Sequence, residues 1–567
     1  MGVTSKRRES VVADLLSAVA KEVQASDAPE RRWQVLDNAV LSQAGGDRVV
    51  LKATDLDSRI QEGAAATARL DGVEFTAEVT SLEFGFITLM IEGCGLASVT
   101  KCELLLPQEE WTKGLYEFLC DSRDELEFAS SQTGSPIAAL VNPSAGWVSA
   151  QKPLTYVVGA PGSGKTTDLI ERALTTADEG KRVAIVTYTN AAADLIFERL
   201  APRIDPEGGV TVCRMGATER SLETEKVHGC ETVGVSSGVR ESLEASILIT
   251  TAYRALACAN IADGTHDVVL IDEASTMPLS LACVVAMLAR SEVRLYGDPY
   301  QLGPIALSEA APETPLMRRF DSSPFELLNF ENPLPAAGPV SVKSGQYRLA
   351  PSLASATLPP LYAQAGTTST IEREPESPWG RGSLLYLDTT ANAAASAQIS
   401  GSRQNQVHAS GVVECVRVLL EQGAVTPDNI DEALLIITPY RAQRVLISQM
   451  LQKTGWFTDQ QIRSLVTTIH RSQGSERDFV VVDTTDALDE SELGEQSVGR
   501  LWQGKGLQST GSRLLTTALT RARMQALVLM RRDVTGTAQD PFSEGAKALA
   551  RLNALLDRRG NPASFSL

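Results

Sequence analysis

The sequence predicts an α/β protein with two successive parallel-sheet domains, preceded by a helical segment and a small β-barrel. The apolar run 154–158 leads into a glycine-rich turn and then a helical pattern at 167–174, which indicates a strand–turn–helix unit. After this unit, short apolar strands alternate with helical patterns up to about residue 530, as expected for parallel sheets. Residues 48–106 instead alternate with a period of two, which favours a barrel or meander.

The chain has 567 residues, which is too long for a single hydrophobic core. Breaks in the patterns divide it into six expected segments. These are an N-terminal helical segment at 1–46, the barrel at 47–107, a helix and linker at 108–153, a first α/β domain at 154–333 with an insertion at about 201–245, a second α/β domain at 334–535, and a C-terminal helix and tail at 536–567.

Composition excludes several classes of function. The eight cysteines form no C-x-x-C pair and the four histidines show no ligand spacing, so neither a zinc site nor a disulfide framework is predicted. A reducing, intracellular location fits best. The longest charge-free apolar run, 277–289, is too short to cross a bilayer, and the N-terminus lacks a secretory pattern. The net charge of −18 means that any nucleic-acid groove must be local.

The glycine-rich turn matches the pattern G-x-x-x-x-G-K-[ST] in its required context between a strand and a helix. Its residues are Gly159, Ala160, Pro161, Gly162, Ser163, Gly164, Lys165 and Thr166, followed by Thr167 at the helix start. Backbone N–H groups of such a loop converge on phosphate oxygens, and the helix N-terminus adds partial positive charge. We expect Lys165 to reach the β- and γ-phosphates of ATP and the Thr166 hydroxyl to bind Mg²⁺.

Two adjacent acids close the strand at 267–271, where an open parallel sheet binds its ligand. Asp272 can hold Mg²⁺, directly or through water, and Glu273 can polarise the attacking water. The next strand ends in a loop that contains Gln301, which can bridge the γ-phosphate, or its water, to a group beyond the sheet.

The second α/β half has no phosphate loop, but polar segments with arginines follow its strands. They lie at 346–348, 438–441, 470–476 and 520–523. A protein that binds a nucleotide between two such domains has a use for these arginines, because they reach the γ-phosphate when the cleft closes.

Taken together, these segments resemble the superfamily 1 helicases, most closely the branch with the nonsense-mediated-decay RNA helicase and the immunoglobulin-mu-binding-protein helicase. The likeness runs from about residue 154 to 531, with every motif in family order. The matching segments are 159–166, 187–194, 272–275, 297–304, 346–351, 437–443, 468–476 and 518–523. The resemblance implies two tandem RecA-like domains with an accessory barrel, and a monomeric ATP-dependent enzyme that moves 5′→3′ on single-stranded RNA or DNA.

The resemblance also implies roles for individual residues. Tyr347 would stack on the adenine, Arg348 and Arg521 would act as arginine fingers, and Gln301 would sense the γ-phosphate. Gly474 and Glu476 would lie near the γ-phosphate and the ribose. The residues that would line a strand-binding groove are Thr189, Asn190, Thr250, Thr438, Pro439 and Thr468. Contacts of this kind read phosphate and sugar, so base sequence and the choice between RNA and DNA stay open.

Some features depart from the family pattern. No glutamine is suitably placed upstream of the phosphate loop to read adenine, the Cys/His-rich domain of the nonsense-decay member is missing, and 470–476 is also similar to the RecD-type branch. Two other functions fit the same motifs. One is an ATP-gated nucleic-acid clamp or protein-displacing remodeller that unwinds no duplex, and the other is a P-loop kinase of a small molecule.

Overall fold

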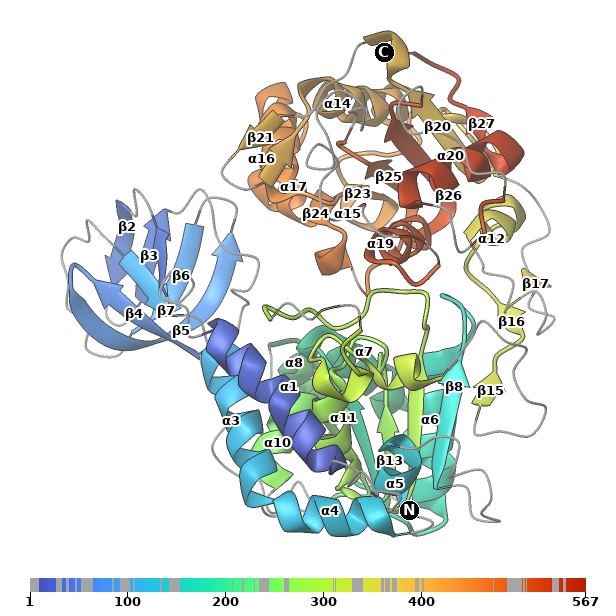
Figure 1. Ribbon diagram of the computed structural model, residues 1–567. Helices are drawn as coiled ribbons and strands as arrows, with labels where there is room; N and C mark the ends of the chain where they lie inside the picture. The colour runs from blue at the N-terminus through green and yellow to red at the C-terminus, as the bar shows by residue number, and fades with distance from the viewer. Residues whose placement is uncertain are drawn as a thin grey trace, which may run out of the picture.

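The computed structural model describes residues 10–566 with internal gaps. The longer gaps are 27–32, 53–64, 92–101, 142–152, 234–243, 260–264, 329–339, 363–367, 370–374, 487–501 and 533–539, and the others are shorter. Figure 1 shows two α/β domains stacked on each other, with an all-β unit beside them. We call the α/β domains domain 1 and domain 2 in chain order, and the all-β unit the β domain.

Domain 1 is built on an eight-stranded parallel sheet with the strand order β11-β10-β12-β9-β13-β14-β8-β15. The strands are β8 (Leu154–Val158), β9 (Val183–Thr187), β10 (Val212–Met215), β11 (Glu231–Val233), β12 (Ile247–Thr251), β13 (His266–Ile271), β14 (Ala289–Gly297) and β15 (Val340–Val342). The helices are α6 (Lys165–Asp178), α7 (Asn190–Leu200), α8 (Glu219–His228), α10 (Ala252–Ala259) and α11 (Leu279–Ala286). Nearly continuous Val, Ile and Leu in the central strands fit a sheet that is buried on both faces.

Two parts of this sheet differ from the sequence-based expectation. The segment 201–245, expected to be an insertion, supplies β10 and β11, which extend the sheet beyond β12. Because most residues around it are polar, the sequence pattern did not predict the short buried strand Val212–Met215. At the other edge, β15 pairs with β8, so the sheet continues past the boundary expected at residue 333.

Domain 2 has a six-stranded parallel sheet with the order β24-β23-β25-β26-β20-β27. The strands are β20 (Leu384–Asp388), β23 (Leu434–Thr438), β24 (Val466–Thr468), β25 (Arg477–Asp483), β26 (Ala522–Met530) and β27 (Asn561–Pro562). The helices are α12 (Pro351–Thr357), α14 (Gln406–Glu421), α15 (Ile430–Ala433), α16 (Arg441–Thr454), α17 (Asp459–Leu465), α19 (Thr510–Leu519) and α20 (Ala548–Arg559). The C-terminal segment therefore belongs to this domain, because α20 packs in its core and β27 extends its sheet.

The N-terminal segment 1–46, expected to be helical, contains the helix α1 (Val11–Ser26), but the expectation of helix is wrong for its later part. The described residues there are strands β1 (Trp33–Leu36) and β2 (Val40–Gly45). Their partners are β7 and β3, so pairing across the β domain decides their conformation.

Helix α1 and the helices after the β domain pack on domain 1. The latter are α3 (Gln108–Asp121), α4 (Arg123–Ser131) and α5 (Pro136–Val141). Leu15 of α1 and Leu119 of α3 share one hydrophobic cluster with Leu281 of domain 1. Buried Glu22 accepts hydrogen bonds from the backbone N–H groups of Leu307 and Ser308 at 2.7 and 2.8 Å. The segment 108–153, expected to be one helix and a linker, therefore contains three packed helices, and its residues 142–152 lie outside the described residues.

The β domain is an antiparallel seven-stranded sheet with the order β1-β7-β4-β5-β6-β3-β2. Its remaining strands are β3 (Arg48–Lys52), β4 (Ala65–Leu70), β5 (Val73–Glu83), β6 (Phe86–Met90) and β7 (Cys102–Leu105). The described parts of the outer strands β1 and β2 do not pair with each other, so the structure shows the strands but not a closed barrel.

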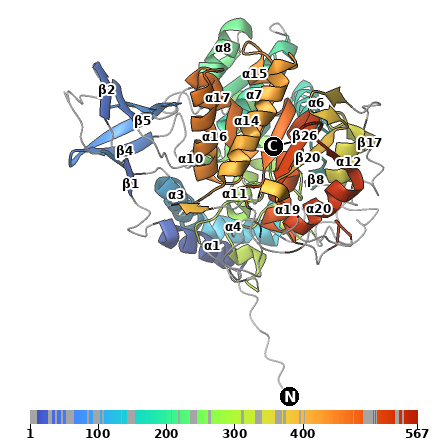
Figure 2. The same ribbon diagram turned by 90° about the horizontal axis from the view of Figure 1, so that it is seen from above.

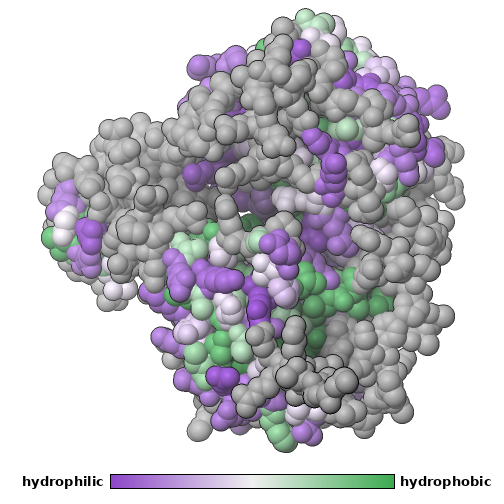
Figure 3. All heavy atoms as spheres, in the orientation of Figure 1, coloured by the Kyte–Doolittle hydropathy of each residue, from purple (hydrophilic) through white to green (hydrophobic). Residues whose placement is uncertain are grey.

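The two α/β domains face each other across a polar seam. Figure 3 shows hydrophilic residues exposed along the junction between them, and Figure 2 shows the β domain projecting from one side. An ion pair joins Arg513 of α19 to Glu326 of domain 1 at 2.9 Å. The carboxyl ends of β8, β13 and β14 open into this seam, which is where a parallel sheet places its ligand site.

Candidate nucleotide site and strand-binding edge

The glycine-rich turn between β8 and α6 has a backbone that favours glycine. Gly162 and Gly164 have φ values of 76° and 81°, in the left-handed region. A Cβ added at Gly162 would lie 2.4 Å from the Cβ of Arg348, because the segment before α12 crosses directly over the turn. The turn therefore depends on glycine for both its conformation and its close packing.

The Lys165 ammonium is held by the turn itself. Its Nζ donates to the carbonyl oxygens of Gly159 and Ala160 at 2.8 and 3.2 Å. Burial lowers the pKa of Lys165, while the nearby carboxylates of Asp298, Glu273 and Asp272 act to raise it. The buried Ser163 hydroxyl has no hydrogen-bond partner among the described residues. A buried cation and an unpaired hydroxyl inside one glycine-rich turn fit a phosphate chain.

Asp272 follows β13 and faces the start of α6. Its Oδ2 accepts a hydrogen bond from Thr166 Oγ1 at 3.2 Å, and its Oδ1 accepts one from the Glu273 N–H at 3.0 Å. Burial and the neighbouring Glu273 raise the pKa of Asp272 to about 6. A hydroxyl and a carboxylate within hydrogen-bonding distance are oxygen donors of the type that Mg²⁺ prefers.

Glu273 has a φ of 52°, which is uncommon for any residue other than glycine. Such a conformation costs free energy and persists where the surroundings fix it, often at functional sites. The sharp turn places Glu273 beside Asp272 at the carboxyl end of β13, and both carboxylates are near Lys165.

Gln301 connects the two domains. Its Nε2 donates to Oδ2 of Asp298 at 3.1 Å within domain 1, and its Oε1 accepts from Nη2 of Arg521 in domain 2 at 3.0 Å. Both Gln301 and Arg521 are buried. The amide therefore spans the seam and joins a carboxylate next to Lys165 to an arginine of the opposite domain.

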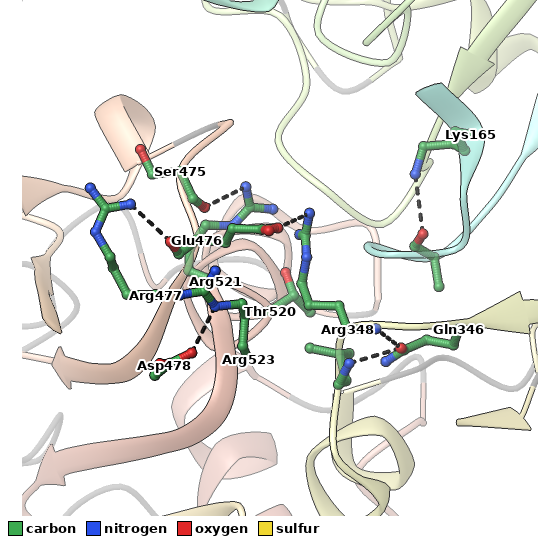
Figure 4. Close-up of polar contacts among 12 residues, drawn as sticks. Lys165, Gln346, Arg348, Ser475, Glu476, Arg477, Asp478, Thr520, Arg521 and Arg523 are labelled. Carbon is green, nitrogen blue, oxygen red and sulfur yellow. Dashed lines mark hydrogen bonds and ion pairs between the residues drawn. The ribbon is translucent and has the colours of Figure 1, made fainter. Parts of the chain in front are cut away.

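The arginines from domain 2 and from the segment entering it cluster on the far side of the seam. In Figure 4, Lys165 lies on one side and Arg348, Glu476 and Arg521 lie on the other. Arg348 forms an ion pair with Glu476, and Nε of Arg521 donates to the Thr517 carbonyl at 3.0 Å. Burial and the neighbouring Arg348 lower the pKa of Arg521 to about 10, so the guanidinium stays charged near neutral pH.

The remaining predicted nucleotide contacts lie around this seam. The Tyr347 N–H donates to the Gly162 carbonyl at 2.8 Å, while 66% of the Tyr347 side chain is exposed, so its ring is available for stacking. Pro161 is buried, Thr167 is exposed at the start of α6, and Gly474 is exposed with a φ of 79°.

The six residues predicted for strand binding lie at or just after the carboxyl ends of strands in both sheets, but their exposure differs. Thr189 and Asn190 are exposed at the start of α7. The other four are buried, namely Thr250, Thr438, Pro439 and Thr468. Thr438 Oγ1 is 2.9 Å from Oγ1 of Thr485, a buried residue with a φ of 63°.

A buried ion pair missed by sequence reasoning supports this edge of domain 1. Arg214 of β10 is fully buried; its Nε donates to Oδ1 of Asp194 and its Nη2 to Oδ1 of Asn190, both at 3.0 Å. The segment that carries Arg214 was expected to be an insertion, so its arginine was not considered. The short run Val212–Met215 ahead of Gly216 is the sequence feature that could have indicated a strand there.

Replacing Arg214 with methionine is expected to lower the free energy of unfolding by about 3–5 kcal/mol, because the Asp194 carboxylate would stay buried without the guanidinium that faces it. Urea unfolding of the full chain measures this loss. The control is Arg203→Met, which breaks an exposed pair with Glu171 and should cost less than about 1 kcal/mol. Equal losses of unfolding free energy in the two variants would contradict the conclusion that the buried pair of Arg214 and Asp194 stabilises the fold.

Comparisons with known proteins give consistent matches. Two family models, each described as an AAA domain, match residues 145–306 and 320–533. The chain is 23% identical over 396 residues to the DNA replication ATP-dependent helicase/nuclease JHS1 of Arabidopsis thaliana, covering 67% of this chain and 27% of that protein. It is 26% identical over 420 residues to a regulator of nonsense transcripts 1 homolog of Neurospora crassa, covering 66% and 36%. With the ATP-dependent helicase NAM7 of Saccharomyces cerevisiae, identity is 25% over 421 residues, covering 67% and 40%.

The chain thus spans roughly a third of the length of these relatives. Among solved structures, the arterivirus nonstructural protein 10 helicase in complex with DNA matches with 14% identity and a TM-score of 0.42, covering 92% of this chain and 80% of that one. Within the part of the chain that the structure describes, no helix has the length and apolar character needed to span a membrane.

Proposed function

Because the chain belongs to the superfamily 1 helicases, in the branch of the nonsense-transcript regulators, we propose that it is an ATP hydrolase that moves along single-stranded RNA or DNA and separates duplexes. The observation that carries this proposal is the contact between Gln301 and Arg521 across the seam. It joins the domain with the phosphate loop to the domain with the arginines, so that closing the seam and completing the ATP site become one event.

The residues of domain 1 would bind ATP and Mg²⁺ and activate the attacking water. The glycine-rich turn and Lys165 would hold the phosphates of ATP, and Thr166 and Asp272 would hold Mg²⁺ through the oxygens that already face each other. ATP supplies a phosphoanhydride bond whose hydrolysis is strongly favourable. Glu273 would orient the attacking water and accept its proton.

Residues across the seam would stabilise the developing negative charge. Arg521 is buried and charged, and it already contacts Gln301. Arg348 is held by Glu476 and would have to leave this carboxylate to reach a phosphate oxygen. Arg521 is therefore the preorganised arginine of the two, and a preorganised charge lowers the barrier because it needs little reorganisation in the transition state.

Movement along a strand would follow from opening and closing of the seam. The residues predicted to line the strand-binding groove occur in both domains, so a change in the seam would shift one set relative to the other. The 5′→3′ direction is inferred from the family. A net charge of −18 requires that backbone contacts at this edge, rather than an overall positive field, hold the strand.

The test is the ATPase rate with poly-dT, with poly-U and with no polymer, followed by strand displacement on a duplex with a 5′ single-stranded tail. We expect a single-stranded polymer to raise kcat and the tailed duplex to be unwound. Stimulation without displacement would instead support an ATP-gated clamp, and ATPase activity insensitive to both polymers would contradict both functions.

A further inference from the structure

Tyr362 links the segment that follows α12 of domain 2 to the core of domain 1. It follows α12 in the chain, yet it is fully buried within the hydrophobic cluster of domain 1. Its ring lies edge-on to Tyr300, with the centroids 6.0 Å apart. Tyr300 immediately precedes Gln301, so Tyr362 packs on the loop that spans the seam.

The Tyr362 hydroxyl donates to Oδ1 of Asp298 at 2.6 Å. The same carboxylate accepts from the Tyr300 N–H at 3.0 Å and, through Oδ2, from Nε2 of Gln301 at 3.1 Å. Since Oε1 of Gln301 accepts from Arg521, a continuous series of hydrogen bonds runs from Tyr362 to the arginine of domain 2.

Asp298 is also an electrostatic neighbour of Lys165. Burial raises the pKa of Asp298 and Lys165 acts to lower it. Even so, Lys165 forms no ion pair with a described carboxylate and donates to two carbonyl oxygens of the phosphate loop instead. Asp298 is turned toward Tyr362, Tyr300 and Gln301, and a buried carboxylate that lost its hydroxyl donor would gain most by turning to the lysine.

We propose that Tyr362 is a positioning residue whose hydroxyl holds Asp298 against Gln301 and away from Lys165. Lys165 is thereby kept free for the phosphates of a nucleotide, and Gln301 is kept aimed at Arg521. The inference rests on the proposed function in one respect, because it takes the turn around Lys165 to be a nucleotide site. It adds that the segment after α12 controls the nucleotide affinity of domain 1 through the Tyr362 hydroxyl.

The test is Tyr362→Phe in the full chain, with the affinity for mant-ATP measured by fluorescence titration and kcat measured separately. A hydrogen bond to a buried charge is lost, so we expect both the affinity and kcat to fall by about tenfold. The matched control is Tyr156→Phe, which removes a buried hydroxyl of domain 1 that has no hydrogen-bond partner among the described residues. It should bind mant-ATP as the wild type does.

A second pair of variants separates the effect of the Asp298 charge on mant-ATP affinity from an effect of packing around Tyr362. Asp298→Asn removes the attraction to Lys165, so the double variant Tyr362→Phe with Asp298→Asn should recover the affinity for mant-ATP while kcat stays low. Asp298→Asn alone should bind mant-ATP with the wild-type affinity. The proposal is overturned if Tyr362→Phe binds as Tyr156→Phe does, or if the double variant binds as weakly as Tyr362→Phe.

These measurements also distinguish the inference from the function on which it rests. A wild-type protein that binds mant-ATP without hydrolysing ATP would overturn the proposed function, while the comparison of affinities would still decide the role of Tyr362. A wild-type protein that binds no mant-ATP would overturn both.

Discussion

Replacing Glu273 with glutamine is expected to lower kcat for ATP hydrolysis by a factor of about 10²–10⁴, the range for loss of a general base. Glutamine keeps the shape and hydrogen-bonding reach of the side chain but cannot accept a proton from water. Binding of ATP should persist, because Lys165, Thr166 and Asp272 are unchanged and one negative charge near the phosphates is removed. Single-turnover kinetics together with mant-ATP titration separate the two effects.

The control for this variant is Glu171→Gln on α6. Glu171 is 57% exposed and pairs with Arg203, so the same chemical change there should leave hydrolysis at the wild-type rate. Ordinary turnover in Glu273→Gln would mean that another group activates the water. A matching loss in Glu171→Gln would mean that the effect is not specific to the site.

The sequence alone predicted the local structure of the candidate site wherever neighbouring residues form it. The strand–turn–helix unit around Lys165 depends on glycines, a lysine and a threonine whose spacing is fixed by the loop itself. The acids after β13 are likewise positioned by the end of one strand. Apolar runs alternating with helical patterns predicted that the strands of both halves run parallel, and the structure confirms this prediction.

The incorrect expectations about strands concern pairing between distant segments. The residues after α1 lie in the segment 1–46 that was expected to be helical, yet β1 pairs with β7 about seventy residues further along the chain. Local patterns contain no information on such partners. For the same reason the closure of the β domain into a barrel could not be inferred from alternation alone.

The supporting residues of the site were missed for a related reason. No sequence motif marks Arg214 or Tyr362. Each matters because of a buried hydrogen bond to a distant residue, Arg214 to Asp194 and Tyr362 to Asp298, which only the folded structure shows. The strand-binding edge also differs from the expectation, because some of the residues predicted to contact a strand are buried. A threonine that follows a strand suggests a surface contact, but Thr438 is fully buried and hydrogen-bonded to Thr485.

Replacing Arg521 with alanine is expected to lower kcat by a factor of about 10³–10⁵, the range for loss of an arginine finger. Arg521 is 4% exposed, and its guanidinium bridges Gln301 of domain 1 and the Thr517 carbonyl of domain 2. The variant removes both the charge proposed to stabilise the transition state and the hydrogen bond to Gln301 across the seam. Stimulation of ATPase activity by a single strand should therefore disappear along with the basal rate.

Arg523 provides the matched control because it lies two residues further along the chain, in β26, which begins directly after Arg521. It forms an exposed pair with Asp478 at 2.8 Å, with 41% of its own side chain accessible. Arg523→Ala makes the same change in charge and size but leaves the contact with Gln301 intact, so it should retain most of the wild-type kcat. If Arg521→Ala kept its turnover, or if both variants lost the same amount, the seam would not be where ATP hydrolysis is completed. A selective loss in Arg521→Ala, with mant-ATP still bound, would mean that domain 1 holds the nucleotide and domain 2 supplies a group needed for its hydrolysis.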